Sequence, residues 1–162
     1  MAIQEKVFKS TDLLMPLVNQ WKNEGYRIVF TNGCFDLIHI GHVFYLEEAN
    51  ALGDKLIVGL NSDASVSRLK GPNRPIKDEY NRSHILAALA SVDAVVIFEN
   101  DDPLQLILDV KPDILVKGGD WKPDQIVGSE FVLSNGGVVK SLRFVEGYSS
   151  TMIEEKIRQS GK

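Results

Sequence analysis

Short runs of β-branched and apolar residues alternate with helical patterns along most of this 162-residue chain. Strands of four to six residues separated by helices form right-handed βαβ units, and hence a sheet of parallel strands. We therefore expect a Rossmann-like, doubly wound α/β fold, with a mainly parallel five-stranded sheet and helices on both faces. The five predicted strands are Arg27–Thr31, Lys55–Leu60, Ala94–Phe98, Ile114–Lys117 and Val138–Leu142.

Between these strands the apolar residues recur with helical spacing, and the segments are bounded by glycine, proline and capping residues. An earlier segment, Ser10–Gly25, is expected to form a helix that packs outside the nucleotide-binding core. The other predicted helices are Gly41–Leu52, Asp78–Val92, a helix with Asp102 as its cap and Pro103 at its first position, and a last one that begins near Thr151.

Composition narrows the class of protein. With 44% hydrophobic and 25% charged residues, the chain is typical of a globular protein and not of a disordered one. Its one cysteine, Cys34, excludes an internal disulfide framework and a multi-cysteine metal site. A net charge of −4 argues against general nucleic-acid binding. No secretory signal and no apolar run of about 20 residues is present, so we expect a cytoplasmic location and no membrane partner.

The most informative segment is TNGCFDLIHIGH, residues 31–42, which follows the first predicted strand. His39 and His42 are three residues apart, so they lie on one face of the helix that should begin there. Gly41 lets a ligand approach the backbone, and the helix N-terminus favours an anion. Two imidazoles at this place can donate hydrogen bonds to phosphate oxygens and stabilise the charge that develops in a transfer reaction. The segment therefore predicts phosphate chemistry.

These residues also allow other interpretations. The two histidines could be zinc ligands, but no third ligand stands at a suitable spacing, or they could be an incidental pair. The third histidine, His84, falls in the middle of a predicted helix and is expected to be structural. A basic stretch over residues 68–82 suits a small polyanion such as a nucleoside triphosphate, although a solvated charged loop would have the same composition.

The sequence HIGH at residues 39–42 resembles the signature shared by class I aminoacyl-tRNA synthetases and small nucleotidyltransferases. A synthetase would be several times longer and would carry a KMSKS-type lysine loop. The segment at residues 31–42 is instead similar to the cytidylyltransferase-like branch. The segment GYSSTMI, residues 147–153, resembles the second signature of that branch, which precedes a final helix.

Three further segments narrow the resemblance to the adenylyltransferases of ADP-heptose synthesis. They are NSDASV at residues 61–66, RLKGPNRP at residues 68–75 and LVKGGDW at residues 115–121. The resemblance covers roughly residues 27–158 and suggests the free-standing form of the enzyme. It implies transfer of AMP from ATP to D-glycero-β-D-manno-heptose 1-phosphate, with Mg²⁺ held mainly by the triphosphate, small-molecule substrates and a homodimer. We accordingly expect one domain over residues 1–162, with residues 1–26 as a helical extension and residues 27–158 as the nucleotide-binding core.

The resemblance also assigns roles to residues. His39, His42 and Lys70 would be catalytic, with the histidines holding the triphosphate and Lys70 bridging the α-phosphate and the incoming sugar phosphate. No residue is assigned as a metal ligand. Nucleotide contacts would come from Thr31, Asn32, Gly33, Cys34, Phe35, Gly41, Lys117, Gly118, Asp120, Arg143, Ser149, Ser150 and Thr151. Acceptor contacts would come from Asp36, Asn61, Asp63, Arg74 and Arg82.

Several of these residues also have a plain structural interpretation. Thr151 and Glu154 form a capping-box pattern, and residues 117–120 could be only a tight turn. Asp36 could orient backbone N–H groups or bind a substrate hydroxyl, and the first is favoured. Cys34 is expected to be a small buried residue and not a nucleophile, because transfer to a phosphate needs no covalent intermediate.

Two other functions fit the same motifs. One is a cytidylyltransferase that uses CTP with glycerol 3-phosphate or phosphoethanolamine. The arginine that glycerol-3-phosphate cytidylyltransferases place before Val-Asp is missing before Val92-Asp93, which counts against it. The other is a nucleotide-binding module without catalysis, which the intact histidines and Lys70 argue against.

Overall fold

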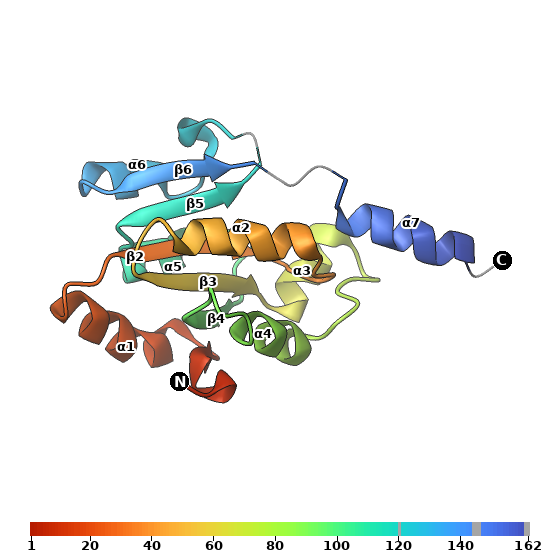
Figure 1. Ribbon diagram of the computed structural model, residues 1–162, viewed down its shortest axis with the longest axis horizontal. Helices are drawn as coiled ribbons and strands as arrows, with labels where there is room; N and C mark the ends of the chain where they lie inside the picture. Colours follow the sequence, from red (N-terminus) through yellow and green to blue (C-terminus); the bar gives the residue numbers. More distant parts are fainter. Residues whose placement is uncertain (120, 144–146, 161–162) are drawn as a thin grey trace.

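The computed structural model describes residues 1–119, 121–143 and 147–160. Within them one parallel sheet of six strands runs in the order β1-β4-β3-β2-β5-β6 (Figure 1). The strands are β1 Val7–Phe8, β2 Ile28–Gly33, β3 Lys55–Asn61, β4 Ala94–Phe98, β5 Ile114–Gly118 and β6 Val138–Leu142. The predicted fold class and all five predicted strands are confirmed.

Helices connect the strands, and the four predicted between or after the strands are present with somewhat different bounds. The α5 helix begins one residue later than predicted, with Pro103 at its N-cap and Asp102 accepting from the N–H of Leu104 at 2.9 Å. Two helices, α3 and α6, were not predicted, because each is short and lacks a clear apolar stripe. Every described helix is too short or too polar to cross a lipid bilayer. The helices are η1 Ile3–Lys6, α1 Thr11–Asn23, α2 Ile40–Asn50, α3 Asp63–Lys70, α4 Glu79–Ala87, α5 Leu104–Val110, η2 Pro123–Gln125, α6 Ser129–Ser134 and α7 Ser150–Ser160.

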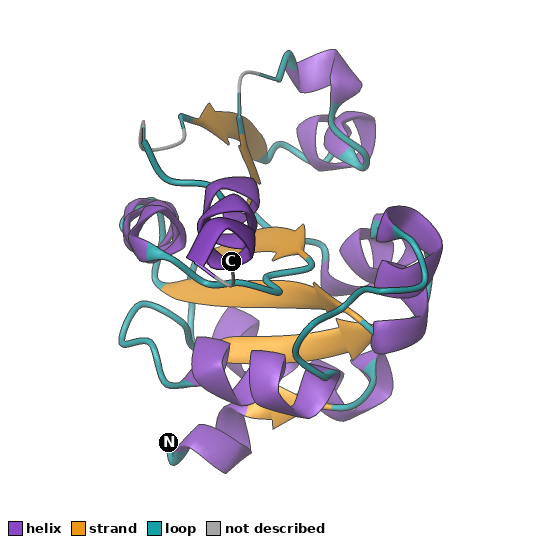
Figure 2. Ribbon diagram, turned by 90° about the vertical axis from the view of Figure 1, so that its right-hand side faces the viewer, coloured by secondary structure: helices purple, strands orange, loops and turns teal. Residues whose placement is uncertain are grey.

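Helices cover both faces of the sheet, as Figure 2 shows. Side chains of a strand alternate between its two faces. In β2, Val29 packs in the core cluster that holds residues of α2 and α4, whereas Ile28 and Phe30 pack in the cluster that holds residues of α1 and α5. The continuous apolar run of β2 is therefore explained by burial on both faces.

The sheet has one strand more than predicted. Val7 and Phe8 pair with Val95 and Val96 of β4, which extends the sheet at one edge. A two-residue strand is too short to produce a periodic pattern in sequence, so it was missed.

The α1 helix was expected to pack outside the nucleotide-binding core. Its Leu14, Val18 and Trp21 are buried in the same hydrophobic cluster as Ile28 of β2. The N-terminal segment thus contributes both a strand and core side chains to the main fold.

The strand order determines where a ligand can enter. β2 pairs with β3 on one side and with β5 on the other. Strands β3, β4 and β1 therefore lie on one side of β2, and β5 and β6 lie on the other side. In parallel sheets the loops diverge at such a switch point and leave a crevice at the carboxyl ends of the strands. The loops that follow β2 and β5 flank this crevice. The α7 helix lies beyond the same ends of the strands (Figure 1).

We predict that Leu14→Ala lowers the free energy of unfolding by ~2–5 kcal/mol, because a fully buried leucine would leave a cavity between α1 and the sheet. Leu13→Ala is the matched control: its side chain is 60% exposed, and its loss should cost less than about 0.5 kcal/mol. Urea denaturation of both variants provides the measurement. Equal, small effects would mean that α1 is only an appendage.

Candidate active site

A cavity of about 180 Å³ opens at the carboxyl ends of β2 and β5, at the switch point of the sheet. Four separate parts of the chain meet there: the loop after β2 with α2, the end of α3, the end of β5 and the start of α7. The lining residues are Asn32, Gly33, Cys34, Phe35, Asp36, His42, Tyr45, Lys70, Lys117, Gly118 and Ser150. Ten of these eleven residues were assigned a role from the sequence, and Tyr45 is the one lining residue that was not.

The loop after β2 has an unusual backbone conformation. Phe35 has φ of 44°, in the left-handed region that a bulky residue rarely adopts. Its ring lies edge-on to the ring of His42, with the centroids 5.4 Å apart, and a Cβ added at Gly33 would lie 3.0 Å from that ring. The loop is thus folded tightly so that Phe35 supports the histidine from one side. Such outliers cluster at functional sites, where the surrounding structure holds them in place.

The two histidines stand at the N-terminus of α2. His39 is the N-cap residue and His42 lies in the first turn, with the ring centroids 4.0 Å apart. The backbone N–H of His39 donates to Nδ1 of His42 at 3.3 Å, so the neutral ring of His42 carries its proton on Nε2. Nδ1 of His39 is buried and has no hydrogen-bond partner among the described residues. An unpaired buried polar atom beside a helix N-terminus indicates that a ligand completes the site.

Gly41 fixes the position of the first imidazole. A Cβ added at this glycine would lie 3.0 Å from both Cε1 and Nδ1 of His39 and 3.6 Å from Cβ of Tyr148. Any larger residue would push the ring away. The glycine between the two histidines is therefore required for close packing of His39 against α2.

Burial keeps both imidazoles neutral. It lowers the pKa of His42 to about 4, with smaller contributions from the charges of His39 and Lys70. Burial likewise lowers the pKa of His39 below its ordinary value. At neutral pH each ring is therefore a directional hydrogen-bond donor, and the positive charge of the site comes from lysines and the helix terminus.

Two lysines supply that charge. Lys70 ends α3 and is exposed, whereas Lys117 near the end of β5 is half-buried. Burial lowers the pKa of Lys117, and Cys34 acts in the opposite direction. Cys34 was expected to be buried but is only half-buried, with its Sγ 3.9 Å from Oδ1 of Asn61. A cavity with two lysines and a helix N-terminus suits a polyanion.

The one carboxylate of the lining, Asp36, is fully occupied by protein donors. It accepts hydrogen bonds from the N–H groups of Ile76 at 2.9 Å and Lys77 at 3.0 Å, and it pairs with Arg74. Burial alone would raise the pKa of this carboxyl, but the two N–H groups and the guanidinium outweigh it and hold the pKa low. These contacts favour the orienting role over binding of a substrate hydroxyl.

Arg74 connects this loop to the last helix. Its guanidinium contacts both Asp36 and Glu154 of α7. Ser150 Oγ donates to the carbonyl of Leu37 at 3.2 Å, which fastens the start of α7 to the loop after β2. The predicted capping box is wrong: Ser149 caps the helix by accepting from the N–H of Met152 at 3.2 Å, and Glu154 pairs with Arg74 instead.

Arg82 was expected to contact the acceptor, but it is fully buried and its donors are used within the protein. It donates to the carbonyl of Cys34 at 2.7 Å, to the carbonyl of Lys77 at 3.0 Å and to the carboxylate of Asp63 at 2.7 Å. Asn61 is also buried and donates to Ser65 Oγ at 3.0 Å. The geometry thus gives Arg82, Asp63 and Asn61 a positioning role instead of substrate contact.

Some predicted residues do not line the cavity, and His39 is one of them, although its ring lies beside that of His42. Thr31 is buried, and its hydroxyl lies 2.6 Å from that of Tyr45. Arg143 follows β6 and Thr151 is exposed in the first turn of α7, while Asp120 lies outside the described residues. Tyr45 was missed, although its position three residues after His42 places both on one helical face.

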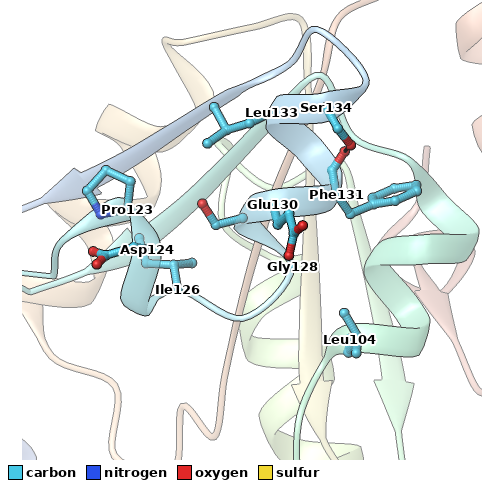
Figure 3. Close-up of a pocket in the computed structure, with 10 residues that line it drawn as sticks. Leu104, Pro123, Asp124, Ile126, Gly128, Glu130, Phe131, Leu133 and Ser134 are labelled. Carbon is cyan, nitrogen blue, oxygen red and sulfur yellow. Dashed lines mark hydrogen bonds between the residues drawn. The ribbon is translucent and has the colours of Figure 1, made fainter.

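A larger cavity of about 850 Å³ lies between α5, η2 and α6, and its lining contains no histidine (Figure 3). Its charged lining residues are Asp124 and Glu130, both acidic, so its field disfavours a phosphate. Among the described residues, no group of three or more His, Cys, Asp or Glu side chains could hold a metal ion. The smaller cavity with its cations is therefore the candidate active site.

Comparisons with known proteins identify relatives of this chain. The family model described as cytidylyltransferase-like matches residues 30–156, which include the histidine pair and the start of α7. The chain is 57% identical over 150 residues to "Bifunctional protein HldE" of Geotalea uraniireducens, covering 93% of this chain and 31% of that protein. It is 51% identical over 162 residues to the protein of the same name of Rhodopseudomonas palustris, covering 100% of this chain and 33% of that protein. The chain thus spans about a third of the length of these curated relatives.

Solved structures support the same fold. A crystal structure of the lipopolysaccharide core biosynthesis protein from Thermoplasma volcanium has a TM-score of 0.59 and 32% identity, covering 77% of this chain and 100% of that one. A pantoate-beta-alanine ligase from Francisella tularensis has a TM-score of 0.59 at 15% identity, covering 94% of this chain and 76% of that one. The second likeness concerns the fold alone.

The low pKa of His42 predicts a pH-dependent stability. The folded chain binds this proton only near pH 4, whereas the unfolded chain binds it near the ordinary value of 6.5. Between these values protons favour the unfolded state, so the free energy of unfolding should fall as the pH drops from about 6.5 to about 4. His42→Gln removes this titration and should show a smaller fall. Urea denaturation at neutral and mildly acidic pH measures both proteins, and parallel curves would contradict the assigned burial of His42.

Proposed function

Because this chain belongs to the cytidylyltransferase-like family, we propose that it transfers AMP from ATP to D-glycero-β-D-manno-heptose 1-phosphate, giving ADP-heptose and pyrophosphate. The observation that carries this proposal is the pair of neutral imidazoles at the N-terminus of α2, of which His42 lines the cavity together with Lys70 and Lys117. The heptose substrate rests on the motif resemblance at residues 61–75 and 115–121. The high identity to proteins named HldE and the likeness to a lipopolysaccharide core biosynthesis protein support it.

The reaction needs alignment and charge neutralisation more than proton transfer. An oxygen of the acceptor phosphate attacks the α-phosphorus of ATP, and the bond from that phosphorus to the bridging oxygen of the β-phosphate breaks. Pyrophosphate leaves with the electron pair, and the acceptor is already an anion, so no strong general base is required. In this scheme His39 and His42 donate hydrogen bonds to phosphate oxygens on which charge accumulates, and Lys70 neutralises the same group from the end of α3.

Magnesium would be held mainly by the substrate. The site offers one carboxylate, Asp36, whose oxygens already accept from Ile76, Lys77 and Arg74. A divalent ion coordinated by triphosphate oxygens and water fits this donor set, because Mg²⁺ retains several waters in nucleotide sites. When bound, it would neutralise charge on the β- and γ-phosphates. The cytoplasmic location and the homodimer stay predictions.

The substrates are tested by a pyrophosphate-release screen of four NTPs against heptose 1-phosphate, glycerol 3-phosphate and phosphoethanolamine. We expect turnover with ATP and heptose 1-phosphate. His42→Gln should lower kcat by ~10²-fold or more, because one preorganised donor to the developing charge is lost. The matched control is His84→Gln, since this histidine lies on α4, stacked on Tyr80 and outside the cavity. Preference for CTP would refute the proposed substrates, and nucleotide binding without turnover would indicate a non-catalytic module.

Gly41→Ala tests the geometry of the first histidine. The added methyl group would lie 3.0 Å from the His39 ring and displace it, so kcat should fall by ~10-fold or more with little loss of stability. Phe44→Ala, at an exposed position of the same helix, should leave kcat nearly unchanged. A Gly41→Ala enzyme with the original kcat would contradict the role given to His39.

A further inference from the structure

A second cavity of about 180 Å³ adjoins the first and shares part of its lining. Asn32 near the end of β2 and Lys117 near the end of β5 line both cavities. The rest of the second cavity consists of Trp121, Gln125 and the apolar side chains of Pro103, Ile126 and Val127. The two cavities therefore form one site with two compartments, divided where the switch-point strands end.

The compartments lie toward opposite faces of the sheet. His42 and Tyr45 of the first belong to α2, which packs on one face. In the second, Pro103 caps α5 and Ile126 belongs to the core cluster on the other face. In phosphoryl transfer the attacking and leaving oxygens stand in line on opposite sides of the phosphorus. If the histidines hold the triphosphate, the attacking phosphate must arrive from the far side, which is the second compartment.

The polar side chains of the shared wall are not used within the protein. Neither Asn32 nor Lys117 has a side-chain hydrogen bond or ion pair with any described residue, although both are half-buried. In Gln125 the carbonyl oxygen accepts from the N–H of Lys122 at 3.2 Å, and the amide N–H groups have no partner among the described residues. This contrasts with Asp36, Arg74 and Arg82, whose charged groups are occupied. Asn32 and Lys117 are partly buried polar groups without such partners and are therefore suited to bind a ligand, whereas Gln125 is exposed.

Trp121 is held in a defined orientation at the rim of the second compartment. Its indole Nε1 donates to the carbonyl of Gly118 at 3.0 Å, and its backbone N–H donates to Ser141 Oγ at 3.1 Å. The side chain is still 47% exposed. An anchored aromatic ring with an open surface, close to amide groups, suits a ring that carries both C–H groups and hydroxyls.

From this geometry we propose that the second compartment binds the sugar of the acceptor, and that Trp121 and Gln125 determine which sugar is accepted. Asn32 and Gln125 donate hydrogen bonds to hydroxyls, and the indole of Trp121 packs against the C–H groups of the ring. Lys117, in the shared wall, contacts the acceptor phosphate and the α-phosphate that it attacks. This inference rests on the proposed transfer of a nucleotide to a sugar 1-phosphate.

Steady-state kinetics of the full chain separates the two compartments. Trp121→Ala and Gln125→Ala should each raise KM for heptose 1-phosphate by ~5- to 10-fold or more, as expected for loss of one packing or hydrogen-bond contact, with KM for ATP within about twofold of the unmodified value. Lys122→Ala is the matched control, because Lys122 lies between Trp121 and Gln125 in the sequence, is exposed and does not line the second cavity. A raised KM for ATP alone would mean that the compartment holds the nucleoside, and unchanged constants would also overturn the proposal.

Calorimetry distinguishes failure of this inference from failure of the proposed function. Heptose 1-phosphate is titrated into the unmodified and the Trp121→Ala proteins, each saturated with a non-hydrolysable ATP analogue. Weaker binding by the variant supports the second compartment as the sugar site even if the pyrophosphate-release assay fails. Equal binding by both proteins overturns the inference while leaving the proposed function intact, and absence of binding to the unmodified protein refutes both.

Discussion

The central place of β2 in the sheet is the constraint from which the site follows. This strand pairs with β3 on one side and β5 on the other, and the chain then builds each half of the sheet outward from it. Since all strands are parallel, their carboxyl ends lie at one edge, and the loops that follow β2 and β5 diverge there. Several groups meet at this opening: the N-terminus of α2, Lys70, Lys117 and the start of α7. They meet there because all of them follow, or lie beside, the carboxyl ends of the strands.

The polar residues around this opening form two groups, which differ in whether their polar atoms are hydrogen-bonded within the protein. Asp36, Arg74 and Arg82 are saturated with internal contacts and hold the loop after β2 in its strained conformation. Nδ1 of His39 and the side chain of Lys117 lack such partners among the described residues, and Lys117 lines the cavity. Residues whose hydrogen bonds are all made within the protein hold the free hydrogen-bond donors in fixed positions. Such a site is preorganised, because little free energy is then spent on moving its groups during the reaction.

The positive charge of the site and its oriented hydrogen-bond donors come from different groups. Burial keeps the rings of His39 and His42 neutral, so they contribute oriented donors. Positive charge comes from Lys70, Lys117 and the N-terminus of α2, and the carboxylate of Asp36 is balanced by Arg74. The cavity therefore attracts a polyanion through its field and positions it through hydrogen bonds.

The sequence by itself determined the fold class and the five principal strands, and it singled out the segment at residues 31–42, part of which lines the cavity. Those features are encoded locally, in the alternation of strand and helix patterns and in two histidines around a glycine. It did not reveal β1, α3 or α6, which are too short to show a period, nor the burial of Leu14, which requires α1 to pack on the sheet. The sequence also could not distinguish the role of Arg82 from that of Lys117. A basic residue near a motif can pair with a backbone carbonyl or bind a ligand, and the sequence does not show which. Only the tertiary structure decided that, because contacts between segments remote in sequence determine which charged groups are already paired.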